Sequence, residues 1–141
     1  MKKQIVIAGS GFAGMWAALS AARAITLAGR NDDVGVTVVS PAPTLVIRPR
    51  LYEATIEGMD PDLLQLFDAT GILHVKGRIT SIDPEAHRLE VVDERGVPTS
   101  LEYDKFVLAT GSRLFQPPVP GLSEHGFNVD QLEDAKKLQA H

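Results

Sequence analysis

The stretch IVIAGSGFAGMWAA, residues 5–18, decides the fold of this chain. An apolar run of β-forming residues at 3–8 leads into its glycines and is typical of a strand buried on both faces. Alanine-rich, apolar residues at 12–28 follow the glycines and predict a buried helix that closes at Gly29. A second run of β-branched residues at 34–40 completes the order strand, glycine turn, helix, strand, which predicts one βαβ unit.

The glycines of this stretch satisfy the pattern G-x-G-x-x-G, with its three positions filled by Gly9, Gly11 and Gly14. The pattern indicates a dinucleotide site when it lies between a strand and a helix, as it does here. Gly9 then permits the tight turn, Gly11 lets the backbone approach a pyrophosphate, and Gly14 lets helix and strand pack closely. The helix N-terminus adds free N–H groups and the positive end of its dipole, so we expect a phosphate-binding site.

One part of the dinucleotide pattern is missing at the end of the second strand. An Asp or Glu is expected there, because a carboxylate accepts hydrogen bonds from the ribose hydroxyls. Ser40 occupies this position, and its hydroxyl is a weaker partner than a carboxylate. Asp32 and Asp33 lie in the turn before the strand, where we expect them to shape the turn.

Two further helical segments are predicted. Residues 60–71 (DPDLLQLFDATG) begin with Asp60 as a candidate N-cap and Pro61 at the first helical position. Residues 129–141 are amphipathic, with Asp130 as the expected cap. Between the second strand and the first of these helices, the chain is proline-rich and extended and then holds one or two helical turns within 50–59.

The remaining β-forming runs predict strands, separated by short turns, at residues 72–75, 78–83, 88–93, 100–104 and 105–112. Residues 87–103 are interpreted as a β-hairpin outside the main sheet. The last run, KFVLATGS, predicts a buried strand that ends at Thr110 and Gly111, where α/β proteins place ligands.

The composition excludes several classes of site. The chain has 141 residues, with 14 basic and 18 acidic side chains and a net charge of -4, which argues against a nucleic-acid partner. It has no cysteine, so disulfides, thiolate metal sites and dithiol redox centres are excluded within these residues, and a cytoplasmic location is expected. No segment approaches the ~20 apolar residues of a membrane span. No metal-site spacing joins the four histidines, His74, His87, His125 and His141.

Four stretches together resemble the pyridine nucleotide-disulfide oxidoreductase superfamily of flavoproteins, and within it most of all the type II NADH dehydrogenases. They are IVIAGSGFAGMWAA, RPRLYEATIEG, VKGRITSIDPEAHRLEVVD and YDKFVLATGSR, at residues 5–18, 48–58, 75–93 and 103–113. The resemblance implies an α/β fold: a Rossmann-like FAD-binding domain with a central parallel sheet and an added antiparallel β-hairpin or meander.

The resemblance also implies which residues surround FAD. The glycine turn would hold the pyrophosphate, with Phe12 and Ala13 lining it, and Ser40 and Pro41 would flank the adenosine ribose. Arg48 and Pro49 would lie near the flavin end. The remaining cofactor neighbours would be Arg78 and Ile79 at the adenine, and the ATG turn of Ala109, Thr110 and Gly111.

The absence of a redox cysteine pair indicates which branch of the superfamily the chain resembles. Thiol-disulfide members carry a redox cysteine pair after the second strand, and residues 41–58 contain none. The resemblance therefore implies an NADH dehydrogenase-like enzyme that takes electrons from NAD(P)H, through FAD, to an acceptor such as a quinone. Membrane-peripheral attachment of the full-length protein would be encoded elsewhere.

Full members of the superfamily are roughly two to three times longer than this chain. They carry a second glycine fingerprint for the nicotinamide nucleotide, which is not found after Gly14. We therefore expect an N-terminal fragment, with a FAD-binding domain at 1–116 and a linker and helix at 117–141 leading toward an NAD(P)H-binding domain. Hydride transfer needs both cofactors, so these residues alone are expected to be catalytically silent and to bind FAD weakly or not at all.

Two alternatives remain from the sequence. One is the FAD domain of another enzyme family with the same opening, such as an amine oxidase or a monooxygenase, which the LATGSR turn at 108–113 disfavours. The other is a stand-alone nucleotide-binding or regulatory module. A reading frame that continues into a second glycine fingerprint would favour the enzyme.

Overall fold

The computed structural model describes residues 2–141 and divides the chain into two compact units. The first unit runs to Thr44 and resumes over Asp62–Gly111, and the second unit combines Leu45–Pro61 with Ser112–His141. The glycine turn and both predicted strands of the βαβ unit lie in the first unit.

The centre of the first unit is a four-stranded parallel sheet in the order β3-β2-β1-β7. Ile7 and Val38 pair in register at its middle and are fully buried. Buried and exposed residues do not alternate along β1 and β2, because both faces of the sheet are covered. The strands are β1 (Lys3–Ala8), β2 (Val34–Ser40), β3 (Ile72–Lys76) and β7 (Lys105–Leu108).

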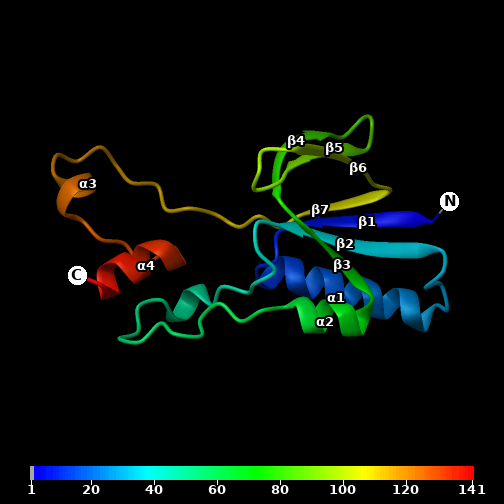
Figure 1. Ribbon diagram of the computed structural model, residues 1–141, viewed down its shortest axis with the longest axis horizontal. Helices are drawn as coiled ribbons and strands as arrows, with labels where there is room; N and C mark the ends of the chain where they lie inside the picture. Colours follow the sequence, from blue (N-terminus) through cyan, green and yellow to red (C-terminus); the bar gives the residue numbers. More distant parts are fainter. Residues whose placement is uncertain (1) are drawn as a thin grey trace. The chain divides into compact units, whose positions relative to one another are not determined.

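Helices α1 (Phe12–Leu27) and α2 (Leu64–Thr70) cover one face of this sheet (Figure 1). α1 has Ala28 as its C-cap, and Gly29 follows in the left-handed conformation with φ 65°. The predicted βαβ unit and its glycine stop signal are therefore confirmed to within one residue.

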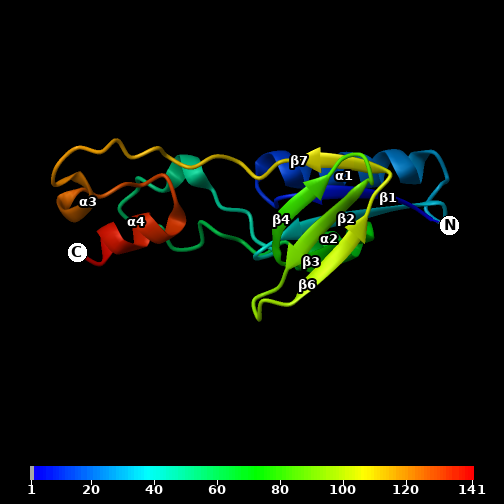
Figure 2. The ribbon, with the colours of Figure 1, turned by 90° about the horizontal axis from the view of Figure 1, so that it is seen from above.

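A second, antiparallel sheet covers the opposite face, in the order β4-β5-β6. Its strands cross the parallel sheet obliquely (Figure 2). Leu89 and Val91 of this sheet share one buried cluster with Val6 and Val39 of the parallel sheet. The expected α/β class with an added antiparallel meander is confirmed. The strands are β4 (Arg78–Asp83), β5 (Arg88–Val92) and β6 (Pro98–Glu102).

The predicted start of the helix at 60–71 is wrong. Asp60 and Pro61 do not begin it, because Thr44 and Asp62 form an antiparallel bridge and the Leu63 amide donates to the Pro43 carbonyl. This pairing keeps the chain extended, and the helix begins at Leu64, whose amide donates to the Asp62 carboxylate at 2.7 Å.

The second unit holds a 3₁₀ turn at Arg48–Arg50 and two short helices, α3 (Leu122–His125) and α4 (Leu132–Gln139). Leu51, Ile56, Met59 and Ala135 form its buried cluster. The prediction of Asp130 as the helix cap is wrong: Gln131 is the N-cap residue of α4 and makes no side-chain cap bond. No helix among residues 2–141 is both long and apolar enough to cross a membrane.

Candidate functional site

Two of the three fingerprint glycines are required by the fold itself. Gly9 has φ 103°, and a Cβ atom on it would lie 2.3 Å from the Ala109 carbonyl oxygen. A Cβ atom on Gly14 would lie 1.9 Å from the Gly9 carbonyl oxygen. Side chains at these positions would therefore collide with backbone. Only glycine allows the helix, the turn and the sheet to pack this closely.

Gly11, the remaining glycine of the fingerprint, differs from Gly9 and Gly14. Apart from Gly11 itself and its neighbours in the chain, no atom of the described residues lies within 4 Å of the place that its Cβ would occupy. Its φ of -64° is accessible to any residue, so neither packing nor backbone conformation requires glycine there. The space above Gly11 is open, and a close approach of a ligand to the backbone is the physical use of a glycine in that place.

The N-terminus of α1 is uncapped by side chains. Gly11 is its N-cap residue, no side chain bonds to its first turn, and that turn holds no acidic residue. The first N–H groups of a helix lack partners within the helix, and their dipole favours an anion. Phe12 and Ala13 expose their side chains there, and the turn can hold a phosphate through its N–H groups.

The ATG turn, Ala109–Gly111, lies against the glycine turn. The Ala109 amide donates to the Ala8 carbonyl at 2.9 Å, and Gly111 takes a left-handed φ of 74°. The structure thus brings two predicted site segments together at the carboxyl ends of β1 and β7.

The segment after β2 is tied to the glycine turn by hydroxyl groups. Ser10, which is buried, donates to the Ala42 and Thr44 carbonyls at 3.2 and 2.8 Å, and Ser40 donates to the Ala42 carbonyl at 2.6 Å. Sequence reasoning missed the role of Ser10, because its partners are more than thirty residues away.

Ser40 also contacts a histidine that the sequence did not connect with it. Nε2 of His74 lies 2.9 Å from the Ser40 hydroxyl, whose own proton goes to Ala42, so His74 donates. Burial, together with the charge of Lys76, lowers the pKa of His74, and a hydrogen bond with the Ser40 backbone and the charge of Asp62 oppose this effect only in part. The lowered pKa favours the neutral ring, which lies beside the end of β2.

Pro41, Arg78 and Ile79 lie where β2 and β3 end. The Gly77 amide donates to the Ser40 carbonyl at 3.1 Å, which fixes the junction between β3 and β4 beside β2. Ile79 packs against the cluster between the two sheets, whereas Pro41 and Arg78 line a cavity of about 260 Å³.

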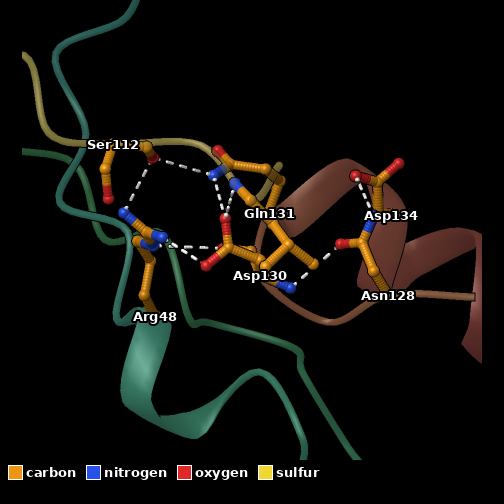
Figure 3. A network of polar contacts seen from close by, with 7 residues as sticks. Arg48, Ser112, Asn128, Asp130, Gln131 and Asp134 are labelled. Atoms are coloured by element: carbon orange, nitrogen blue, oxygen red, sulfur yellow. Dashed lines mark hydrogen bonds and ion pairs between the residues drawn. The ribbon is translucent and has the colours of Figure 1, made fainter. Parts of the chain in front are cut away.

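In the second unit, Arg48 is the centre of a polar network (Figure 3). Its Nε donates to the Asp130 carbonyl and its Nη1 to the Ser112 carbonyl, each at 3.1 Å, and its Nη2 contacts the Asp130 carboxylate. Asp130 also accepts from the Leu114 amide at 3.1 Å and from the Gln131 side chain at 2.7 Å. Arg48 thus joins the two segments of the second unit, and Pro49 follows it in the 3₁₀ turn.

We expect this network to loosen in acid. The hydrogen bond from the Gln131 side chain, and then that from Arg48, lower the pKa of Asp130 below its ordinary value of 3.8. A carboxylate with a depressed pKa stabilises the folded state above the unfolded pKa, and this contribution is lost as the pH falls through the folded value. The protection of the Leu114 amide from hydrogen exchange, corrected for intrinsic rates, should therefore fall between about pH 5 and pH 2.

Asp130→Asn should show low Leu114 protection with little dependence on pH, whereas Glu133→Gln, which removes a carboxylate outside this network, should behave as the unaltered chain. Identical profiles for Asp130→Asn and the unaltered chain would contradict the role of Asp130.

Among residues 2–141, no three His, Asp or Glu side chains come close enough to form a metal site. The candidate site consists of the glycine turn, the adjacent ATG turn and a cavity at the ends of β2 and β3.

The sequence is similar to those of known proteins. The family described as "Pyridine nucleotide-disulphide oxidoreductase" matches residues 3–141. An NADH dehydrogenase-like protein of Mycobacterium tuberculosis, Rv1812c, is 41% identical over 139 residues, which cover 98% of this chain and 34% of that protein. Demethylphylloquinone reductase NdbB of Synechocystis is 28% identical over 143 residues, covering 98% of this chain and 35% of that protein.

The fold recurs in solved structures. NDH2 from Plasmodium falciparum, solved in complex with NADH, superposes with a TM-score of 0.79 at 19% identity, over 99% of this chain and 28% of that one. The chain thus spans about a third of the length of the curated relatives described above.

Proposed function

The chain belongs to the pyridine nucleotide-disulphide oxidoreductase family, and on this premise we propose that it forms the FAD-binding part of an NAD(P)H-dependent oxidoreductase. The observation that carries the proposal is the open space at Gly11. Two glycines of the fingerprint are needed by the fold, and the third faces the uncapped N-terminus of α1 with nothing over it. A glycine is needed at this position if a pyrophosphate approaches the backbone closely, because a side chain would occupy the same space.

In this proposal the glycine turn holds the FAD pyrophosphate through backbone N–H groups, with Phe12 and Ala13 in the first turn of α1. Ser40 and Pro41 flank the adenosine ribose, and Arg78 and Ile79 border the adenine. The ATG turn supports this placement, because Ala109 lies against Gly9. Bound FAD would supply the hydride- and electron-transfer chemistry, and the chain's own residues bind and orient it.

Arg48 and Pro49 are proposed as neighbours of the flavin end. The bonds of the Arg48 guanidinium to Asp130 and Ser112 favour a supporting role, in which Arg48 fixes the 3₁₀ turn and Pro49 presents its surface. This proposal also places a FAD-binding region at 1–116 and a connecting segment at 117–141.

We further propose that the whole protein transfers electrons from NAD(P)H, through FAD, to a quinone. The names of the relatives support this reaction: one is NADH dehydrogenase-like and another is a demethylphylloquinone reductase. These 141 residues hold no cysteine, so no disulfide within them can carry electrons between flavin and acceptor. A cytoplasmic protein that works at the membrane surface would meet both substrates.

The proposal is tested by Gly11→Val and Gly11→Ala with ADP, the half of FAD that the glycine turn would hold. Titration calorimetry or chemical-shift titration of the 141-residue chain should show ADP binding. Gly11→Val should weaken this binding by about tenfold or more, because its side chain occupies the space of the pyrophosphate.

The free energy of unfolding of Gly11→Ala should stay within about 0.5 kcal/mol of that of the unaltered chain. The loss of a favourable N-cap residue is offset by the smaller entropy of the unfolded alanine chain. The proposal fails if the unaltered chain does not bind ADP, or if Gly11→Val binds ADP as well as the unaltered chain does.

A further inference from the structure

A cavity of about 260 Å³ lies at the carboxyl ends of β2 and β3, next to the position from which the ribose-binding acid is missing. The turn between β5 and β6 contributes its acidic residues to the wall of this cavity. The lining residues are Pro41, Gly77, Arg78, Val92, Asp93 and Glu94.

The hydroxyl of Ser40, at the end of β2, is already engaged in hydrogen bonds and is poorly available to a ribose. Its side chain is buried, its hydroxyl proton is donated to the Ala42 carbonyl at 2.6 Å, and it accepts from His74 at 2.9 Å. A ribose hydroxyl at this edge therefore needs an acceptor from another element.

The Asp93 carboxylate is occupied by hydrogen bonds within its own turn. Its Oδ1 accepts from the Arg95 and Val97 amides at 2.9 and 2.8 Å, and its Oδ2 contacts the Arg95 side chain at 3.3 Å. Withdrawing this carboxylate would open the turn, so Asp93 is a structural group.

Glu94 is placed differently. Its Oε1 lies 2.8 Å from Nζ of Lys76, the last residue of β3, and Lys76 pairs in register with Ser40. In this ion pair the Glu94 carboxylate lies beside the end of β3. The Glu94 side chain is 71% exposed, and among the described residues its Oε2 has no hydrogen-bond partner.

We propose that Glu94 is the ribose-binding carboxylate of this chain, supplied by the β5–β6 turn in place of the acid that β2 lacks. This inference rests on the proposed adenine dinucleotide site. Glu94 accepts hydrogen bonds from the ribose hydroxyls through its Oε2, while Lys76 holds Oε1. Such charge-assisted bonds to a hydroxyl pair are the interaction that a carboxylate at the end of β2 provides elsewhere.

The test compares ADP with 2′-deoxy-ADP, which lacks one of the ribose hydroxyls. The unaltered chain should bind ADP about five- to tenfold more tightly than 2′-deoxy-ADP, as expected for the loss of one bond to a charged acceptor in a partly exposed site. Glu94→Gln should reduce this ratio to near one. The matched control is Glu102→Gln, on exposed β6 and outside the cavity, which should keep the full ratio.

Lys76→Met adds a second readout. Without its ion pair, Glu94 loses its fixed position, so the ratio should fall part of the way. The inference is overturned if Glu94→Gln binds ADP and keeps the ratio of the unaltered chain, or if the unaltered chain does not distinguish the two nucleotides. If the unaltered chain binds neither nucleotide, the proposed function fails and this inference fails with it.

Discussion

Gly14→Ala is expected to lower the free energy of unfolding of the first unit by about 3 kcal/mol, a severe case of overpacking. The added methyl would lie 1.9 Å from the Gly9 carbonyl oxygen, which belongs to backbone and cannot rotate away as a flexible side chain could. Relief requires α1 to move off β1 or the glycine turn to change shape. For a chain of this size, the melting temperature should fall by about 9 °C.

The matched control for this variant is Gly11→Ala, which adds the same methyl three residues earlier, into open space. Thermal unfolding followed by far-ultraviolet circular dichroism should separate the two variants clearly. If Gly14→Ala melts within about 2 °C of Gly11→Ala, the close approach of α1 to the turn does not hold the fold.

Phe67→Ala is expected to lower the free energy of unfolding by about 3–4 kcal/mol, in the range found for aromatic truncations in protein cores. Phe67 is the largest of the fully buried side chains, with 1% exposure, and its ring lies beside that of His74 at a centroid distance of 6.3 Å. Truncation removes its apolar contacts and leaves a void between α2 and the sheet, since the neighbouring strand can collapse only in part.

Leu66→Ala provides the control on the same helix, because Leu66 is 37% exposed and buries much less area. Its expected cost is below about 1 kcal/mol. Denaturant titrations of both variants measure the difference, and equal midpoints would show that α2 does not anchor the first unit through Phe67.

The parts of the fold that could be predicted from the sequence depend on local signals. The β-branched runs of β1 and β2, the glycine spacing between them and the stop at Gly29 are all read within a few residues of each element. The hairpin predicted at 87–103 depends on the same kind of signal, since a short turn at Asp93–Gly96 joins β5 to β6. The three-stranded meander was implied by the family resemblance.

The errors came from contacts between distant residues. Asp is a residue type favoured at helix N-caps, but Arg48, 82 residues before Asp130, binds the carboxylate and the backbone carbonyl of Asp130. Asp60 precedes a proline as a helix start should, yet the pairing of Thr44 with Asp62 keeps the chain extended beyond it. The link between Ser40 and His74 depends on the register of β2 against β3, which no local pattern reveals.

The bridge between Thr44 and Asp62 has a consequence for how sequences of this kind can diverge. It brings the two ends of the segment Leu45–Pro61 together inside the first unit, whose sheet and glycine turn are complete on either side of it. Loop closure costs little more for a longer segment than for a shorter one. Changes in the length of residues 45–61 should therefore cost the first unit little as long as the two ends still meet at this bridge, whereas the residues that pack against Ala135 or bind Asp130 remain constrained by the second unit.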